Sequence, residues 1–187
     1  MGISINQTKK FETEVVVPQN VNVTLKNFMM RVEGPLGKTY KNFKKIPVNI
    51  NINDNKIILK ASGTRKKHYA ILNTAKSIIQ TLCEGVVDGY TIKMKIISSH
   101  FPITVKTDGK RVLIENFQGE KAHRVTRIWG ETKVVSKGED LIITGHVLTD
   151  VTQTAAEIQD GTKVKNKDHR VFLDGIYRYF KSKGIEK

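Results

Sequence analysis

Few residues of this 187-residue chain have the types and the spacing that catalysis or metal binding requires. Five histidines are scattered without metal-ligand spacing: His68, His100, His123, His146 and His169. The single cysteine, Cys83, excludes an internal disulfide framework and a cysteine-based zinc site. Phosphate-loop, serine-hydrolase, metalloprotease and dinucleotide-binding motifs are absent. The sequence therefore predicts no catalytic residue, no metal and no cofactor.

Positively charged side chains are the strongest chemical signal in the sequence. Lysine and arginine total 32 against 18 aspartates and glutamates, which gives a formal net charge of +14. A small domain usually carries a net charge of about 2 to 8. Cationic side chains placed on phosphates release condensed counterions, and this release drives nucleic-acid binding. The charge therefore predicts a polyanionic partner, of which nucleic acid is the commonest.

The basic residues are densest at the C-terminal end. The stretch that starts at Gly161 holds eight basic and three acidic residues. Within it, Lys163, Lys165 and Lys167 come at every second position. In a strand this alternation would place three ammonium groups along one edge, where they could follow a phosphate backbone. Apolar residues interrupt the stretch, which favours an anchored element over a free solvated tail.

A second basic group precedes the only tryptophan. Lys121, Arg124 and Arg127 lead into Trp129. A lone tryptophan belongs more often to a core or an interface than to a base-stacking platform. The sequence leaves both roles open for Trp129, and phosphate contact is the role that suits the three cations.

Strands dominate among the elements that must position these cations. Apolar and polar residues alternate over 21–32 and 48–61, which is typical of strands that have one buried face and pair by hairpins. Apolar residues follow helical spacing over 69–85, so we expect a helix there that packs on the sheet, with Gly85 as its C-terminal cap. Cys83 lies on this apolar stripe and is interpreted as a core thiol.

The pattern repeats after about 85 residues, a period long enough for each copy to hold its own sheet and helix. Three pairs of segments resemble each other: 21–38 and 103–121, 54–63 and 138–147, and 85–90 and 171–176. A second, shorter helical stripe begins at Val151 and ends near Asp160. We therefore expect an α+β fold of two similar lobes, residues 1–88 and 89–187, each a mostly antiparallel sheet packed on one helix.

Membrane and secretory routes find no support in the sequence. No stretch approaches the roughly 20 apolar residues of a membrane-spanning helix, and the first residues lack the apolar core of a signal peptide. With one cysteine, the chain is expected to be a soluble protein of a reducing compartment, without a membrane partner.

Four segments, in order and spacing, closely resemble the large-ribosomal-subunit protein "L six" family in its cytosolic eukaryotic form. The segments are GPLGK, GVVDGYTIKMKIISSHFPI, ENFQGEK and KVKNKDHRVFLDGIY. The resemblance extends from about Val17 to Tyr177 and includes the internal duplication. The last segment is the most specific, and its expected positions are held by Val164, Lys167, Arg170, Phe172, Asp174, Gly175, Ile176 and Tyr177.

The resemblance implies a non-catalytic building block of the large ribosomal subunit in the cytoplasm. Its implied partners are large-subunit rRNA and neighbouring ribosomal proteins, with translational GTPases nearby. The second lobe would hold rRNA near the sarcin–ricin region, and the first would project towards the stalk base. The motif and the basic residues together predict these rRNA-binding residues: Lys121, Arg124, Arg127, Lys163, Lys165, Lys167, His169, Arg170, Tyr177, Arg178, Lys181 and Lys183. Phe172, Leu173 and Ile176 are expected to point inward and fix the direction of the cations.

Two other classes of function remain open at this point. An RNA-modifying enzyme would use Cys83 or a histidine, and a cofactor signature would favour it, but the sequence has none. A basic adaptor for proteins or anionic membranes would need an amphipathic helix with a cationic face. The visible helical stripe instead suits a helix that covers a sheet.

Overall fold

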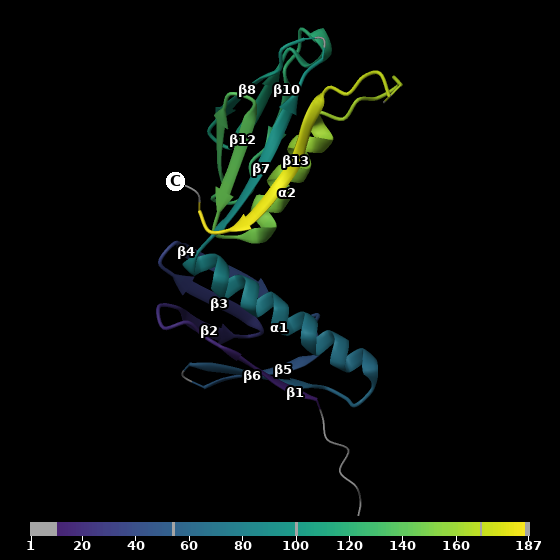
Figure 1. Cartoon of the computed structure of the whole chain (residues 1–187). Helices are drawn as coiled ribbons and strands as arrows, with labels where there is room; N and C mark the ends of the chain where they lie inside the picture. The colour runs from purple at the N-terminus through teal and green to yellow at the C-terminus, as the bar shows by residue number, and fades with distance from the viewer. Residues whose placement is uncertain (1–10, 54, 100, 169, 186–187) are drawn as a thin grey trace, which may run out of the picture. The chain divides into compact units, whose positions relative to one another are not determined.

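The computed structural model describes residues 11–53, 55–99, 101–168 and 170–185 (Figure 1). The chain divides into two compact units, Met1–Val87 and Asp88–Lys187. Each unit has its own buried hydrophobic cluster, and the two clusters share no residue. Both units combine antiparallel sheets with one long helix, which confirms the predicted α+β class.

The first unit consists of two three-stranded antiparallel sheets and helix α1 (Lys66–Val87). One sheet has the order β1-β6-β5 and the other β2-β3-β4. The strands are β1 (Glu12–Val16), β2 (Asn22–Lys26), β3 (Met29–Gly34), β4 (Gly37–Asn42), β5 (Val48–Asn53) and β6 (Lys56–Ala61). The buried residues of α1 recur every three or four positions: Leu72, Ala75, Ile79, Cys83 and Val86. This stripe packs on the strands, as the apolar spacing predicts.

The end of α1 differs from the prediction. Gly85 is buried inside the helix instead of capping it, and the helix continues to Val87. The Leu36 amide donates a hydrogen bond to the Val86 carbonyl, with an N–O distance of 3.0 Å, so the turn between β3 and β4 binds the last helical turn. Gly89, with a φ of +76°, provides the left-handed residue that follows the helix.

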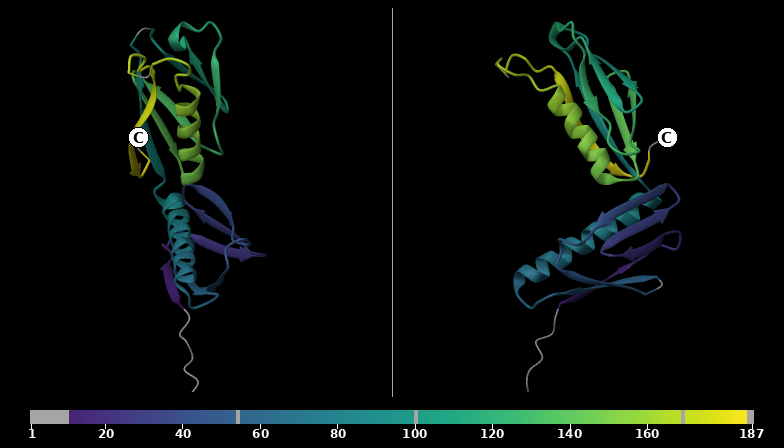
Figure 2. Two further views of the ribbon diagram at one scale, coloured as in Figure 1. Left: turned by 90° about the vertical axis from the view of Figure 1, so that its right-hand side faces the viewer. Right: turned by 180° about the vertical axis from the view of Figure 1, so that it is seen from behind.

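The second unit has a four-stranded antiparallel sheet in the order β11-β12-β7-β13 and a three-stranded one in the order β10-β9-β8. Its strands are β7 (Tyr90–Ile97), β8 (Thr104–Asp108), β9 (Arg111–Glu115), β10 (Arg124–Arg127), β11 (Lys133–Lys137), β12 (Asp140–Gly145) and β13 (Gly175–Lys183). Helix α2 (Leu148–Gly161) lies along one face of the larger sheet (Figure 2), and a 3-10 turn, η1 (Phe117–Gly119), follows β9. In the described residues, neither α1 nor α2 is both long and apolar enough to cross a membrane.

The same series of elements occurs in both units, in agreement with the internal repeat. The hairpin β2-β3 with β4 corresponds to β8-β9 with β10, and β5-β6-α1 corresponds to β11-β12-α2. Strand β7 takes the place beside β12 that β1 takes beside β6. The second unit adds β13 on the free side of β7. This extra edge strand and the loop that leads to it carry most of the predicted site residues.

Candidate nucleic-acid interface

The basic loop between α2 and β13 (residues 162–174) is anchored at both ends. The buried Thr162 amide donates to the carbonyl of Ile158, at an N–O distance of 3.1 Å, and its hydroxyl accepts the amide of Ile176 at 3.1 Å. At the other end, the buried Asp174 carboxylate accepts the Ser99 amide at 2.6 Å. The loop therefore starts and ends on the core, as the apolar residues in the sequence predict.

The first three lysines of this loop are all exposed, but they do not lie on a strand. Val164 is buried and sends Lys163 and Lys165 outward on either side of it. The alternation ends at Asn166, whose φ of +59° turns the chain before Lys167. Burial alternates as expected over 163–165, although no sheet hydrogen bonds form there.

Two of the loop cations, Lys167 and Arg170, have partners inside the loop. The Lys167 ammonium lies 4.7 Å from the centroid of the Phe172 ring. The Arg170 guanidinium pairs with the Asp168 carboxylate at an N–O distance of 3.1 Å, although the arginine side chain is highly exposed. His169 lies outside the described residues.

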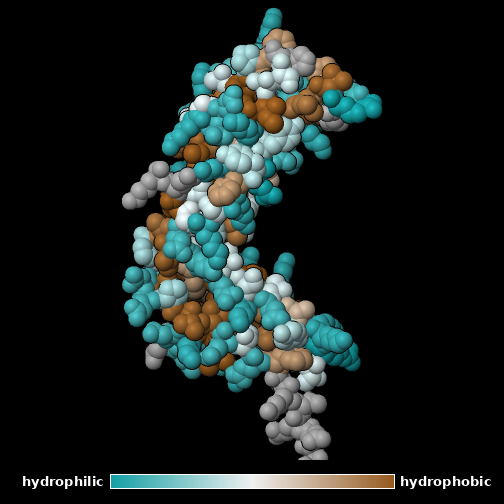
Figure 3. Space-filling view, viewed as in Figure 1, coloured by the Kyte–Doolittle hydropathy of each residue, from teal (hydrophilic) through white to brown (hydrophobic). Residues whose placement is uncertain are grey.

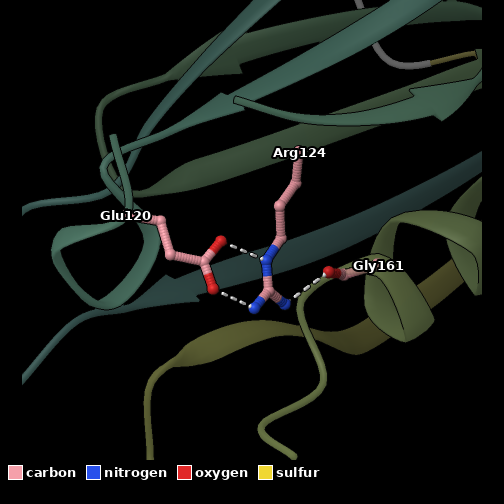
Figure 4. A network of polar contacts seen from close by, with 3 residues as sticks. All are labelled: Glu120, Arg124 and Gly161. Atoms are coloured by element: carbon pink, nitrogen blue, oxygen red, sulfur yellow. Dashed lines mark hydrogen bonds and ion pairs between the residues drawn. The ribbon is translucent and has the colours of Figure 1, made fainter. Parts of the chain in front are cut away.

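Arg124 is tied into the fold by four contacts, three of them shown in Figure 4. Its Nε and one terminal nitrogen donate to the two carboxylate oxygens of Glu120, at 2.8 and 2.5 Å, and the other terminal nitrogen donates to the Gly161 carbonyl at 2.9 Å. The guanidinium also lies 4.1 Å from the centroid of the Phe117 ring. Arg124 therefore joins the end of α2 to the segment before β10.

The Arg124 network lowers the pKa of the Glu120 carboxyl group. Hydrogen bonds from Arg124 hold the pKa of Glu120 below its ordinary value against the opposing effect of burial, and the charges of Arg124 and Lys167 add to the lowering. The charge of Lys167 thus acts on Glu120 in the same direction as that of Arg124.

Trp129 serves as a structural anchor in this region. Its indole nitrogen donates to the Glu157 carboxylate at 2.6 Å, and its amide donates to the Thr154 hydroxyl at 3.0 Å, both on α2. The Arg127 guanidinium lies 4.8 Å from the centroid of the indole ring. Lys121 is exposed and makes no ion pair with a described residue.

The predicted residues on β13 divide between the two faces of its sheet. Arg178, Lys181 and Lys183 lie opposite the buried residues of β7, on the side of α2, whereas Tyr177 lies opposite Lys95 on the other side. Seven cations thus line the loop and the outer strand: Lys163, Lys165, Lys167, Arg170, Arg178, Lys181 and Lys183. We call this set the basic edge.

The predicted inward residues are partly wrong. Ile176 is fully buried and Phe172 packs against the core, as expected. Leu173 is 53% exposed, and its carbonyl accepts the Tyr177 hydroxyl at an O–O distance of 3.3 Å. Because the neighbouring Asp174 turns inward to reach Ser99, the Leu173 side chain points to solvent.

Groups that could perform redox or metal chemistry do not assemble in the described part of the chain. Cys83 is buried, and desolvation, helped by the charge of Glu84, raises its pKa to about 11. A thiol with so high a pKa is a poor nucleophile, in agreement with the prediction of a core thiol. Histidine, cysteine and acidic residues form no group of three that could hold a metal ion within the described ranges.

Sequence reasoning missed several residues near the basic edge, two of them exposed aromatic side chains. Tyr179 and Phe180 follow the predicted Tyr177 and Arg178 on β13, and Lys93 lies beside them on β7. The run YRYF was a possible signal, because a regular half-buried strand does not expose aromatic residues at consecutive positions.

Comparison with known proteins identifies the family of the chain. A family model described as Ribosomal protein L6 matches residues 101–175, from the turn before β8 to the start of β13. The large ribosomal subunit protein uL6 of Staphylothermus marinus is 42% identical over 170 residues, 89% of this chain and 92% of the relative. The proteins of that name from Desulfurococcus amylolyticus and Methanobrevibacter smithii are 41% and 40% identical, over 92% and 88% of this chain and 95% and 92% of theirs. These identities extend over nearly the whole of each chain, so the chain belongs to the ribosomal protein L6 family.

Proposed function

We propose that this chain is a structural constituent of the large ribosomal subunit and that its second unit binds large-subunit rRNA through the basic edge. Relatives of nearly the same length bear the name of a large ribosomal subunit protein, which supports a ribosomal building block and not an enzyme. The work of such a protein is to hold folded RNA in place.

The anchored basic edge is the observation that carries this proposal. Four of its cations, Lys163, Lys165, Arg178 and Lys181, make no ion pair with any described residue, so their charges are available to a partner. Val164, Thr162 and Asp174 fix the loop backbone without using these charges. Cations on a loop anchored at both ends suit the phosphate backbone of folded RNA better than the edges of particular bases.

Lys121 and Arg127 would extend this contact, and Arg124 would support it indirectly. The guanidinium of Arg124 is used by Glu120, Gly161 and Phe117, so its part is to hold the basic loop against the segment before β10. The pair of Arg170 with Asp168 is exposed, and an exposed pair contributes little, so phosphate could replace the carboxylate.

The finer location follows from the family resemblance. The bound rRNA would lie near the sarcin–ricin region and the stalk base, where the second unit would support the site at which translational GTPases dock. The first unit, with its separate core, would extend towards neighbouring ribosomal proteins at the stalk base.

Binding of the full chain to a sarcin–ricin rRNA fragment across salt concentrations tests the proposal. If about six phosphates are neutralised, the logarithm of the binding constant should fall with the logarithm of salt concentration at a slope of roughly −4 to −5. The double variant Lys165→Ala/Arg170→Ala should bind less tightly with a shallower slope and an unchanged unfolding midpoint. Lys44→Ala/Lys45→Ala, which removes two exposed lysines of the first unit, provides the charge-matched control. Equal affinities of wild type and double variant would place the site elsewhere.

A further inference from the structure

The four-stranded sheet of the second unit has one face that no described element covers. The buried residues of this sheet, among them Met94 and Leu141, point to the opposite face, where α2 and the smaller sheet complete the core. β13 crosses in front of α2 in Figure 1, and α2 lies in front when the molecule is seen from behind in Figure 2. The uncovered face therefore looks towards the viewer in Figure 1 and in the space-filling view of Figure 3, where hydrophilic and hydrophobic residues are mixed over the sheet.

Strand register places two aromatic residues of β13 on this open face. Tyr177 lies opposite Lys95 and Phe180 opposite Lys93, and both lysines alternate with the buried residues of β7. Side chains of directly opposed residues share one face of an antiparallel pair. Tyr177 and Phe180 therefore point away from the core.

An irregularity in β13 adds a third ring to the same face. The register shifts between Arg178 and Phe180, which leaves Tyr179 as the extra residue. The Tyr179 hydroxyl donates to the carboxylate of Asp140 at 3.3 Å, and Asp140 belongs to β12, on the far side of β7. In a regular strand consecutive residues point to opposite faces, and a bulge changes the direction of a side chain. The bulge thus puts Tyr179 beside Phe180 and lays its ring across β7.

The three rings are largely exposed to solvent. The exposed fractions are 41% for Tyr177, 55% for Tyr179 and 46% for Phe180. Single exposed apolar residues are ordinary on a protein surface, but three exposed aromatic residues on one face of one strand favour an interaction site. Because the bulge is what gathers them, the group is a built feature of this strand.

Lysines surround the rings. The Lys93 ammonium lies 5.5 Å from the centroid of the Phe180 ring. Lys95 pairs with Glu139 and Asp140 at N–O distances of 3.1 and 3.6 Å. By register, Lys133 and Lys137 of β11 lie on the same face, opposite Thr144 and Asp140. Four lysines against one aspartate and one glutamate give the face a positive charge, which favours an anionic partner.

We propose that this open face binds an unpaired segment of RNA. Bases would stack on Tyr179 and Phe180, and Lys93, Lys133 and Lys137 would lie near the connecting phosphates. Aromatic rings on a sheet need the flat faces of unpaired bases, which a duplex does not offer. The inference rests on the proposed function, since the unpaired segment is taken to be part of the rRNA. It adds a second contact of different chemistry on the other side of β13 from Arg178.

A pair of labelled RNAs tests this inference on the full chain. One is an unstructured 12-nucleotide RNA, and the other is a hairpin closed by a non-nucleotide linker, so that all of its bases are paired. Tyr179→Leu/Phe180→Leu should weaken binding of the unstructured RNA by roughly 5- to 100-fold, the effect of losing one stacked base. The salt dependence and the affinity for the hairpin should stay unchanged, because every lysine remains. Photo-crosslinks from thiouridine in the unstructured RNA should map to residues 175–183.

Phe101→Leu is the matched control, because Phe101 is equally exposed but lies outside β13 and the open face. Equal losses on both RNAs would mean that the double variant disturbs the basic edge, and this would overturn the inference. So would unchanged RNA binding combined with poorer incorporation into large subunits, which would indicate a protein partner on this face. The Lys165→Ala/Arg170→Ala variant tests the proposed function separately, so either idea can fail while the other stands.

Discussion

Arg124 illustrates how a residue predicted from its charge to contact phosphate also has partners within the folded chain. A basic residue beside Lys121 is a reasonable phosphate contact in the sequence, but three hydrogen-bond acceptors and an aromatic ring already surround its guanidinium. Its side chain is only 26% exposed. Hydrogen bonds from charged groups and contact with an aromatic face both gain strength as water is excluded. The guanidinium of Arg124 therefore already has partners within the second unit, and its contact with a phosphate stays a prediction.

Replacement of Arg124 should lower the stability of the chain more than the loss of one positive charge alone would. Arg124→Ala is expected to lower the free energy of unfolding by about 2 kcal/mol, because the Gly161 carbonyl and the Glu120 carboxylate lose their donor. Urea unfolding measures the loss. Lys121→Ala removes the same charge from an exposed side chain and should change stability by less than about 0.5 kcal/mol. Equal effects of the two substitutions would contradict the structural role of Arg124.

The same pair predicts a pH dependence. The pKa of Glu120 is lowered in the folded chain, mainly by hydrogen bonds from Arg124, so its stabilising contribution is complete above the unfolded value of about 4.3. This contribution is lost as the pH falls through the lower, folded pKa. Wild type should therefore be more stable than Glu120→Gln at pH 7, and the difference should shrink below about pH 4.

Unfolding midpoints of both proteins from pH 3 to pH 7 provide the measurement. Glu131→Gln serves as the control, because Glu131 is exposed and has no partner in the described residues. It should follow wild type at every pH. A gap between wild type and Glu120→Gln that persists unchanged at pH 3 would show that the carboxylate charge does not matter to the pair.

At the scale of elements, local periodicity predicted those helices and strands whose formation depends on neighbouring residues alone. The alternation over 48–61 and the apolar stripe of α1 each became the expected element because burial of one face sets both patterns. Contacts between distant residues decided the rest. The end of α1 depends on Leu36, and the Arg124 network depends on Gly161, 37 residues away. The bulge at Tyr179 depends on pairing with β7, which no local pattern records.

The start of β13 yields a further prediction about the interface. A Cβ atom at Gly175 would lie 2.8 to 2.9 Å from atoms of the Tyr177 ring, so the ring packs directly over this glycine. Gly175→Ala should displace the ring and lower the free energy of unfolding by about 1 to 3 kcal/mol. Adding Tyr177→Ala should restore part of this loss, because the clash is then removed. Full additivity in a double-mutant cycle of thermal unfolding would exclude the contact.

At the scale of the whole molecule, the duplication provides two separate hydrophobic cores, and the second unit adds β13, a strand with two different faces. In our proposals the basic edge binds phosphates of folded RNA, whereas the open face of β13 binds unpaired bases. Both depend on the core of the second unit, since Thr162, Val164 and Ile176 anchor the loop there. The first unit has its own buried cluster and none of the predicted rRNA-binding residues. Damage to one core should therefore have consequences that differ from damage to the other.

Trp129 makes this difference measurable, because the only tryptophan of the chain belongs to the second unit. Leu72→Ala and Ile158→Ala each remove a fully packed side chain, from the first and second core respectively, at a cost of about 2 to 5 kcal/mol. In urea, Ile158→Ala should shift the tryptophan fluorescence transition to lower denaturant. Leu72→Ala should leave that transition in place and shift only part of the circular-dichroism signal. If Leu72→Ala moves the fluorescence transition as far as Ile158→Ala does, the two units unfold as one.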